Sequence, residues 1–346
     1  MLQGNHPQGK MKKKVIIDCD VGVDDALALI LAFHSPALDI KAVTGVNGNV
    51  PIDTVFLNIQ KVLSLIQPPD RPMIARGAGQ PLRGRAIYAR SVHGEDGLGG
   101  IKMKRRQGAE SWQIFPGPAD ELITHTARQY PDELTLIAIG PLTNLALGLQ
   151  KDAAGMKKLR RIVIMGGAVR TRGNITPYAE FNFFIDPLAA ARVFESGLPI
   201  TLVPLDVTHQ VFLDAQIIED KVRVLNNPFS HLVIEATGYH SVNHQFRGGA
   251  KTFYLHDPLA VGALTHPHLV RKENLSLQVE TEEGERYGKV GEVAEENGIR
   301  KIEVCMGVDS EKFLNLFLSG LEDCTNIAHQ GRKKCGDYPG SERPLL

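Results

Sequence analysis

The sequence predicts a single α/β domain, a Rossmann-like sandwich built on a mostly parallel central sheet. Two observations lead to this prediction. Short runs that are apolar throughout, rather than alternating, recur along the chain, as in strands that are covered on both faces. Between these runs lie segments with the apolar spacing of amphipathic helices. Because strands and helices alternate, the strands are expected to lie parallel and to be joined by crossover helices.

The elements follow one another in that order. The first strand is expected at "VIID" (15–18), and the helix "DDALALILAFH" follows it directly. Later strands are expected at 40–46, 134–140, 161–167 and 200–206, with helices at 55–66, 119–130, 141–150 and 186–196. A helix-rich stretch at about 214–265 precedes short strands near 275–280, 286–293 and 301–307, and a final helix at 310–321. The domain is expected to span 13–325, with poorly ordered tails at 1–12 and 326–346.

Composition excludes several classes of protein. The 346 residues include 39 basic and 39 acidic side chains, and this balance argues against non-specific binding of nucleic acid or anionic membranes. No apolar run approaches the roughly 20 residues that span a bilayer, and the N-terminus lacks the apolar stretch of a signal peptide. The four cysteines are widely spaced and form no CxxC pair, which is typical of reduced thiols. We therefore expect a cytoplasmic protein with neither a nucleic-acid nor a membrane partner.

The octet "DCDVGVDD" places four carboxylates, Asp18, Asp20, Asp24 and Asp25, between a buried strand and an apolar helix. A helix N-terminus stabilises each nearby carboxylate by only about 0.3–1 kcal/mol, too little to offset the repulsion among several close, partly buried acids. A hard divalent cation resolves this conflict, because Ca²⁺ and Mg²⁺ bind carboxylate and carbonyl oxygens. The simpler alternative is that one aspartate caps the helix and the others are solvated.

A strand that ends in Asp-x-Asp also occurs in phosphatases of the haloacid-dehalogenase type, where one aspartate is the nucleophile. That chemistry needs a phosphate-binding Ser or Thr after a second strand and a later Lys. The other strand ends offer no convincing lysine or phosphate loop. The phosphatase is therefore the less favoured alternative.

The other strand ends carry amides, acids and one aromatic. These residues are Asn47, Asn49, Thr143, Asn144, Asn174, Glu180, Phe181 and Asn182, followed much later by His256 and Asp257. In a parallel sheet, ligands bind beyond the carboxyl ends of the strands. Amide and carboxylate groups there suit a polyhydroxyl ligand such as a sugar, because each hydroxyl can both donate and accept a hydrogen bond.

Five motifs, in this order and spacing, resemble the inosine–uridine-type nucleoside hydrolase family over roughly residues 13–320. They are "DCDVGVDDALAL", "GPLTN", "IMGGA", "GNITPYAEFNF" and "HDPLAV". The resemblance implies the nucleoside hydrolase fold and the hydrolysis of a ribonucleoside to ribose and a free base. It also implies a homodimer or homotetramer, the common states of the relatives.

The resemblance further implies an inverting reaction at a Ca²⁺ site. The calcium ligands would be Asp20, Asp25, the backbone carbonyl of Thr143, and Asp257. Asp20 would take a proton from the water that the ion holds, and His256 would protonate the leaving base. The residues implied to bind substrate are Asp24, Asn49, Met165, Asn174, Glu180, Phe181 and Asn182. Asp18 is expected to orient its neighbours.

The residues around the leaving base are less well defined by the sequence. His93 lies in a glycine-rich segment expected to form a flap over the base. His240 and His244 stand near the places where relatives carry base-covering tyrosines. The segment 284–301 also departs from the shorter hairpin of the family. The sequence leaves open whether purines or pyrimidines are preferred. It also leaves open the alternative of a Ca²⁺-dependent protein that binds nucleosides without turnover. The presence of Asp20, His256 and Asp257 argues against the latter.

Overall fold

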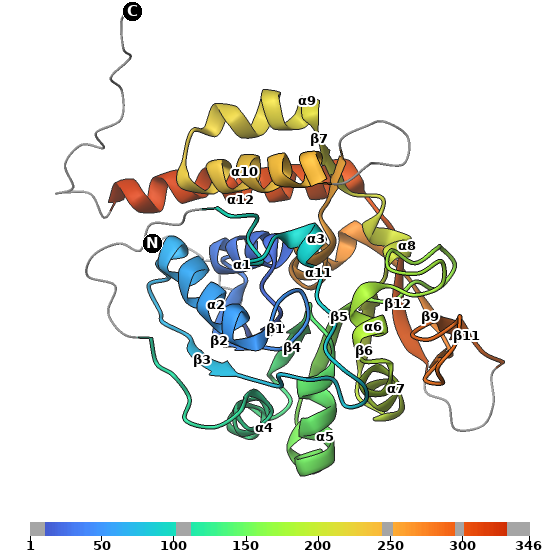
Figure 1. Ribbon diagram of the computed structural model, residues 1–346. Coiled ribbons are helices and arrows are strands. Elements are labelled where there is room, and N and C mark those ends of the chain that lie inside the picture. The colour runs from blue at the N-terminus through green and yellow to red at the C-terminus, as the bar shows by residue number, and fades with distance from the viewer. Residues whose placement is uncertain (1–10, 102–111, 244–251, 295–300, 331–346) are drawn as a thin grey trace, which may run out of the picture.

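The computed structural model describes residues 11–101, 112–243, 252–294 and 301–330 (Figure 1). Within these residues, eight strands form one sheet in the order β3-β2-β1-β4-β5-β6-β12-β9. The strands are β1 (Lys13–Cys19), β2 (Leu38–Gly45), β3 (Met73–Arg76), β4 (Thr135–Ala138), β5 (Arg161–Met165), β6 (Ile200–Val203), β9 (Val270–Leu275) and β12 (Ile302–Val308). Neighbouring strands pair in parallel from β3 to β12, and β9 is antiparallel to β12. The predicted α/β fold with a mostly parallel sheet is confirmed.

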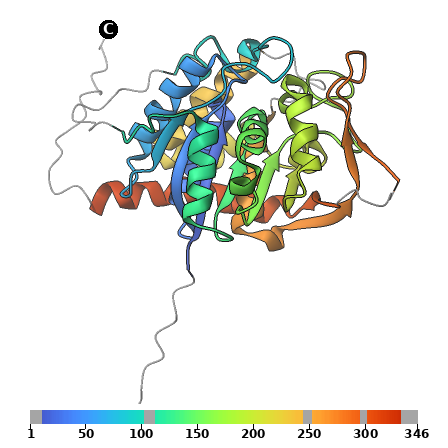
Figure 2. The same cartoon turned by 90° about the horizontal axis from the view of Figure 1, so that it is seen from below.

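Helices cover both faces of this sheet (Figures 1 and 2). One apolar core includes residues of α1 (Val23–His34), α2 (Ile52–Ile66), α10 (Pro228–Asn243), α11 (His256–Thr265) and α12 (Ser310–Gln330). The other core includes residues of α4 (Ala119–Gln129), α5 (Thr143–Met156) and α7 (Pro187–Glu195). The crossover helices that were expected between the strands therefore separate into two layers.

Strand β1 illustrates why the strand sequences are apolar throughout. Val15, Ile16 and Ile17 are each fully buried, but Ile16 belongs to the core on one face and its two neighbours to the core on the other. Successive side chains of a strand point to opposite faces, so a sheet covered on both faces buries them all.

Several elements were not expected from the sequence. They include β3 and β9 at the two edges of the sheet, and a two-stranded pairing of β7 (Phe212–Asp214) with β8 (Thr252–Tyr254). The strands expected near 275–280 and 286–293 are present as β10 (Leu277–Val279) and β11 (Val290–Glu292), which pair in a further small sheet, and α12 continues past its expected end to Gln330. Residues 1–10 and 331–346 lie outside the described residues, as does 295–300 within the segment that departs from the family. Among the described helices, none has both the length and the apolar character needed to cross a bilayer.

The strand order reverses direction between β1 and β4, since the chain continues from β1 to β2 and β3 on one side and from β4 to β5 and β6 on the other. Such a switch point opens a crevice at the carboxyl ends of the strands, where ligands bind in open α/β sheets. The acidic octet begins in β1 and ends in α1, and therefore lies at this crevice.

Candidate active site

Five aspartates meet at the carboxyl end of β1. Asp18 lies in β1, Asp20 follows it, and Asp24 and Asp25 occupy the first turn of α1. Asp257 joins them from the first turn of α11, which packs against α1. All five are buried, with at most 7 % of any one exposed. The fold thus brings together acids that are more than 200 positions apart in the sequence.

Asp25 closes the octet into a tight turn. Its Oδ1 accepts the backbone N–H of Asp20 at 3.1 Å, and its Oδ2 accepts that of Gly22 at 2.9 Å. The side-chain amide of Asn49 donates to the same Oδ2 at 3.2 Å, and the Asn49 backbone N–H donates to Oδ2 of Asp20 at 2.7 Å. The loop after β2 is therefore held against the octet by both groups of one asparagine.

Asp24 links the first turn of α1 to the first turn of α11. Its Oδ2 accepts the backbone N–H of Asp257 at 3.0 Å, and its carboxylate also accepts from the backbone N–H of His256. The positive end of the α11 dipole thus faces a carboxylate of α1, which favours the ionised form. This contact fixes α11 relative to α1.

Among the described residues, three carboxylate oxygens of the cluster are buried without a hydrogen-bond partner: Oδ2 of Asp18, Oδ1 of Asp20 and Oδ1 of Asp24. Burial raises the pKa of Asp18 to about 7 and that of Asp25 to about 6. Burial also raises the pKa of Asp20, Asp24 and Asp257 well above the usual range. An isolated buried carboxylate is costly, so these oxygens fit a cation better than they fit one another.

The acids do not form a complete cage by themselves. In the described part of the chain, no three His, Cys, Asp or Glu side chains are arranged as a metal-binding group. A hard cation here would take further oxygen ligands from backbone carbonyls, substrate or water, as Ca²⁺ and Mg²⁺ commonly do. The ligands expected from the sequence are Asp20, Asp25, the Thr143 carbonyl and Asp257.

Asp18 has a different set of contacts. Its Oδ1 accepts hydrogen bonds from Oγ1 of Thr44 at 2.5 Å and from Nδ2 of Asn144 at 2.8 Å. The Asn144 amide also donates to the Gly45 carbonyl at 3.0 Å. Asp18 therefore links the carboxyl ends of β1 and β2 to the start of α5.

Two glycines that the sequence analysis did not select leave room for the Asp20 carboxylate. A Cβ at Gly48 would lie 2.0 Å from Oδ2 of Asp20, and a Cβ at Gly140 would lie 3.0 Å from Oδ1. The fragments "NGN" and "IGP" around these glycines indicate turns in the sequence but give no sign of this close approach.

Asp186 is another buried acid that the sequence analysis took only for the start of a helix. It is 1 % exposed, and its Oδ2 accepts from Oγ1 of Thr143 at 2.7 Å and from the backbone N–H of Leu82 at 2.8 Å. Its Oδ1 caps α7 by accepting from the Ala189 N–H at 3.1 Å. Asp186 thus holds Thr143, the residue whose carbonyl was expected to face the cation.

Asn182 and Met165 lie where β4 and β5 end. The Asn182 side-chain amide donates to the carbonyl of Ile139 at 2.9 Å and to that of Met165 at 3.3 Å. Its Nδ2 also lies 3.7 Å from the sulfur of Met165. Asn182 therefore spans two adjacent strand ends at the crevice.

Glu180 caps the short helix α6 (Phe181–Ile185) and is 2 % exposed. Its carboxylate accepts the backbone N–H groups of Asn182 at 2.9 Å, Phe183 at 3.2 Å and Gly167 at 2.9 Å. Burial nevertheless raises its pKa above the usual range. Asn174 lies beside it, since its Oδ1 accepts the Phe181 N–H at 2.9 Å.

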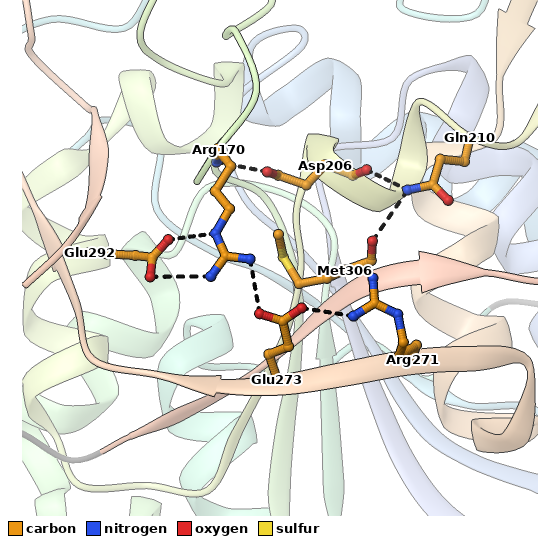
Figure 3. Close-up of polar contacts among 7 residues, drawn as sticks. All are labelled: Arg170, Asp206, Gln210, Arg271, Glu273, Glu292 and Met306. Atoms are coloured by element: carbon orange, nitrogen blue, oxygen red, sulfur yellow. Dashed lines mark hydrogen bonds and ion pairs between the residues drawn. The ribbon is translucent and has the colours of Figure 1, made fainter.

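The loop that leads from β5 to Asn174 and Glu180 is anchored at its base, as Figure 3 shows. Asp206, in α8 (Leu205–Thr208), accepts the backbone N–H groups of Val169 at 2.8 Å and Arg170 at 2.7 Å. The Arg170 guanidinium forms ion pairs with Glu292 of β11 and Glu273 of β9. Because these pairs are exposed, they contribute more to loop geometry than to stability.

One histidine lies against the start of α1, and another is the first residue of α11. The backbone N–H of Val23 donates to Nδ1 of His93 at 3.3 Å, so His93 at the end of α3 (Arg90–His93) lies against the octet. A hydrogen bond of 2.7 Å joins Nδ1 of His256 to Oγ1 of Thr208. Of the two remaining histidines predicted to contact the base, His240 lies in α10 with its side chain outside the description, and His244 lies outside the described residues.

The model of the inosine-uridine preferring nucleoside hydrolase family matches residues 15–315. The chain belongs to this family. It is accordingly a hydrolase that acts on N-glycosyl compounds, and the haloacid-dehalogenase alternative is set aside.

Relatives and solved structures agree with this assignment. The pyrimidine-specific ribonucleoside hydrolase RihA of Salmonella schwarzengrund is 40% identical over 79% of this chain and 86% of its own length. RihA of Shewanella sp. is 38% identical over 90% of this chain and 96% of its own. The structure of a purine-preferring ribonucleoside hydrolase from Gardnerella vaginalis superposes with a TM-score of 0.83 at 28% identity, covering 91% of this chain and all of that one. The relatives of this nucleoside hydrolase therefore include some that are named for pyrimidines and one that is named for purines.

Proposed function

We propose that this nucleoside hydrolase is a Ca²⁺-dependent enzyme that cleaves the N-glycosidic bond of pyrimidine ribonucleosides to ribose and free base. The observation that carries the proposal is the group of buried carboxylate oxygens without hydrogen-bond partners on Asp18, Asp20 and Asp24. A protein with this much buried, unpaired negative charge needs a cation, and oxygen donors favour a hard one.

Asp20, Asp25, the Thr143 carbonyl and Asp257 would hold the Ca²⁺. When bound, the ion would neutralise the carboxylates, orient the ribose hydroxyls and lower the pKa of a water. The remaining catalytic work belongs to the side chains of the chain. Asp20 is the proposed base, since its Oδ1 is buried without a hydrogen-bond partner while its Oδ2 is fixed by Asn49.

The proposed reaction inverts configuration at C1′. Asp20 takes a proton from water as the water oxygen bonds to C1′, and the bond between C1′ and the base nitrogen breaks. The electron pair of that bond goes to the base, which takes a proton from His256. Positive charge on the sugar ring in the oxocarbenium-like transition state is stabilised by the surrounding carboxylates.

The ribose contacts are proposed from the resemblance to the family. Asp24 and Asn182 are proposed to bind the 2′-hydroxyl and Asp257 the 3′-hydroxyl. Glu180 and Asn174 are proposed to bind the 5′-hydroxyl. Asn49, Met165 and Phe181 complete the ribose site, and His93, His240 and His244 are proposed to contact the base. Support for this division comes from Asn182 lying at the strand ends and Glu180 lying at the start of α6.

The pyrimidine preference is supported by the relatives, because those at 38–40% identity are named pyrimidine-specific. The purine-preferring neighbour is only 28% identical to this chain. The higher identity to the relatives named pyrimidine-specific therefore supports the proposed preference.

A panel of nucleosides tests the proposed function. Ribose released from uridine, cytidine, inosine and adenosine is measured with a reducing-sugar assay, once with added Ca²⁺ and once with a chelator. We expect faster release from the pyrimidines and no release with the chelator. Calcium-dependent binding of uridine without ribose release would instead identify a binding protein, and release that favours inosine would overturn the base preference.

We also propose a cytoplasmic homodimer or homotetramer. The family to which the chain belongs supports this proposal. Light scattering of the purified protein tests it, and a monomer at micromolar concentration would contradict it.

A further inference from the structure

We propose that Thr208 is a positioning residue that fixes the imidazole ring of His256 for proton transfer to the leaving base. The inference deepens the proposed function and rests on it. Thr208 is the last residue of α8 and is fully buried. Its Oγ1 lies 2.7 Å from Nδ1 of His256, across 48 positions of sequence.

Two aromatic rings also lie beside His256. The ring of Tyr254 lies 5.5 Å from it, tilted by 34°, and the ring of His209 lies 5.6 Å away, nearly edge-on at 62°. The hydrogen bond to Thr208 is directional, so it favours one rotation of the imidazole about the Cβ–Cγ bond.

Thr208 itself is held firmly. Its backbone N–H donates to the Pro204 carbonyl at 3.1 Å, and the Leu205 N–H at the start of α8 donates to the Gly167 carbonyl at 2.9 Å. Asp206 ties the same helix to the loop after β5. The hydroxyl is therefore presented from a rigid element, which is what precise placement of a catalytic group requires.

The hydrogen bond also decides which proton is transferred. In the protonated ring both nitrogens carry hydrogen, so Nδ1–H donates to Oγ1 of Thr208. The proton on Nε2 is then the one that moves to the base nitrogen as the C1′–N electron pair arrives there. The ring is left neutral with its hydrogen on Nδ1, still bonded to Thr208.

Thr208→Val tests the inference because valine keeps the shape of threonine and removes the hydroxyl. Two substrates are compared: uridine, whose base leaves poorly without a proton, and 4-nitrophenyl β-D-riboside, whose 4-nitrophenolate leaves unaided. We expect kcat on uridine to fall about 10- to 100-fold, and kcat on the nitrophenyl riboside to change by less than about threefold. Equal losses on both substrates, or no loss on either, would overturn the inference.

Three further measurements separate positioning from a structural role. Thr208→Ser retains the hydroxyl and should recover most of the uridine activity. In a His256→Ala background, Thr208→Val should cause no additional loss on uridine, because the two changes act through one group. Thr126→Val is the matched control, since Thr126 is a buried threonine whose hydroxyl donates to the Leu122 carbonyl of its own helix at 2.8 Å.

Two outcomes keep this test distinct from that of the proposed function. If the unmodified protein with Ca²⁺ cleaves neither substrate, the proposed function fails and Thr208 is not at issue. If the unmodified protein cleaves both, the comparison of variants judges Thr208 alone. Thr208→Ala replaces the valine variant should the latter fold poorly, and a serine variant as slow on uridine as the alanine variant would also overturn the inference.

Discussion

At the scale of single residues, the site depends on how each buried carboxylate is satisfied. Asp25 has hydrogen-bond donors on both of its oxygens, whereas Asp20 has a donor on Oδ2 and none on the buried Oδ1. This difference in surroundings separates two chemically identical side chains. Asp25 is suited to holding the turn and a cation, and Asp20 has an oxygen available for a proton.

Asp20→Asn should therefore abolish turnover while leaving the fold intact. An amide of the same shape cannot accept a proton from water, so kcat should fall by about 10²-fold or more, the usual contribution of a general base. Ribose release and circular dichroism are measured together. The control is Asp152→Asn, a carboxylate that pairs with Arg128 at the surface. An Asp20→Asn variant with near-normal kcat would rule out the assigned base.

Gly48→Ala should have a comparable effect without changing any polar group. The added methyl would lie 2.0 Å from Oδ2 of Asp20, so the carboxylate or the loop must move. Misplacement of a catalytic group by about 1 Å can cost about 10²-fold in rate. Gly291→Ala is the matched control, since a Cβ there meets nothing within 4 Å. Equal kcat values for the two variants would contradict the close approach.

The residues that the sequence analysis selected around the octet are those with a visible chemical signature. Clustered aspartates between a strand and a helix, and amides after successive strands, are improbable unless they bind something. Gly48, Asp186 and Thr208 have no such signature, because each acts only through a neighbour that is distant in the sequence. A turn glycine, a helix cap and a helix-end threonine are ordinary in any globular chain.

At the scale of elements, prediction succeeded where burial alone determines the structure. The strands β4, β5 and β6 are buried almost throughout and are mainly apolar, and β1 and β2 are buried toward their carboxyl ends. The edge strand β3 has four residues, and in β9 only the first residue, Val270, is buried. Their pairing depends on neighbouring strands rather than on their own composition, so neither was expected.

Helix α8 illustrates how a four-residue element can serve two parts of the site. Asp206 holds the loop that leads to Asn174 and Glu180, and Thr208 contacts His256. Asp206→Ala should release the loop and raise KM for uridine about 10-fold, since hydrogen bonds to a charged group contribute about 1.5–3 kcal/mol each.

Steady-state kinetics on uridine measures this effect. The matched control is Asp309→Ala, which removes a carboxylate that accepts the Lys312 N–H at the start of α12. A KM for Asp206→Ala within twofold of that for the control would show that the loop does not need this anchor.

At the scale of the whole molecule, the metal should be linked to folding. Five buried aspartates at one end of the sheet oppose folding until a cation neutralises them. A cation that binds the folded state alone stabilises it by about 2.7 kcal/mol at 100 times its Kd. We therefore expect Ca²⁺ to raise Tm and a chelator to lower it. Differential scanning fluorimetry measures Tm with added Ca²⁺ and with the chelator. A Tm that does not change with calcium would argue against the site.

The central claim is that one calcium ion at these aspartates is required for ribonucleoside hydrolysis. The most direct test removes metal from the purified protein and titrates Ca²⁺ back while bound calcium and ribose release from uridine are measured on the same samples. The account predicts that activity rises with occupancy and reaches its plateau at one calcium per chain. Full ribose release from protein that contains no metal, or calcium binding that restores no release, would contradict it.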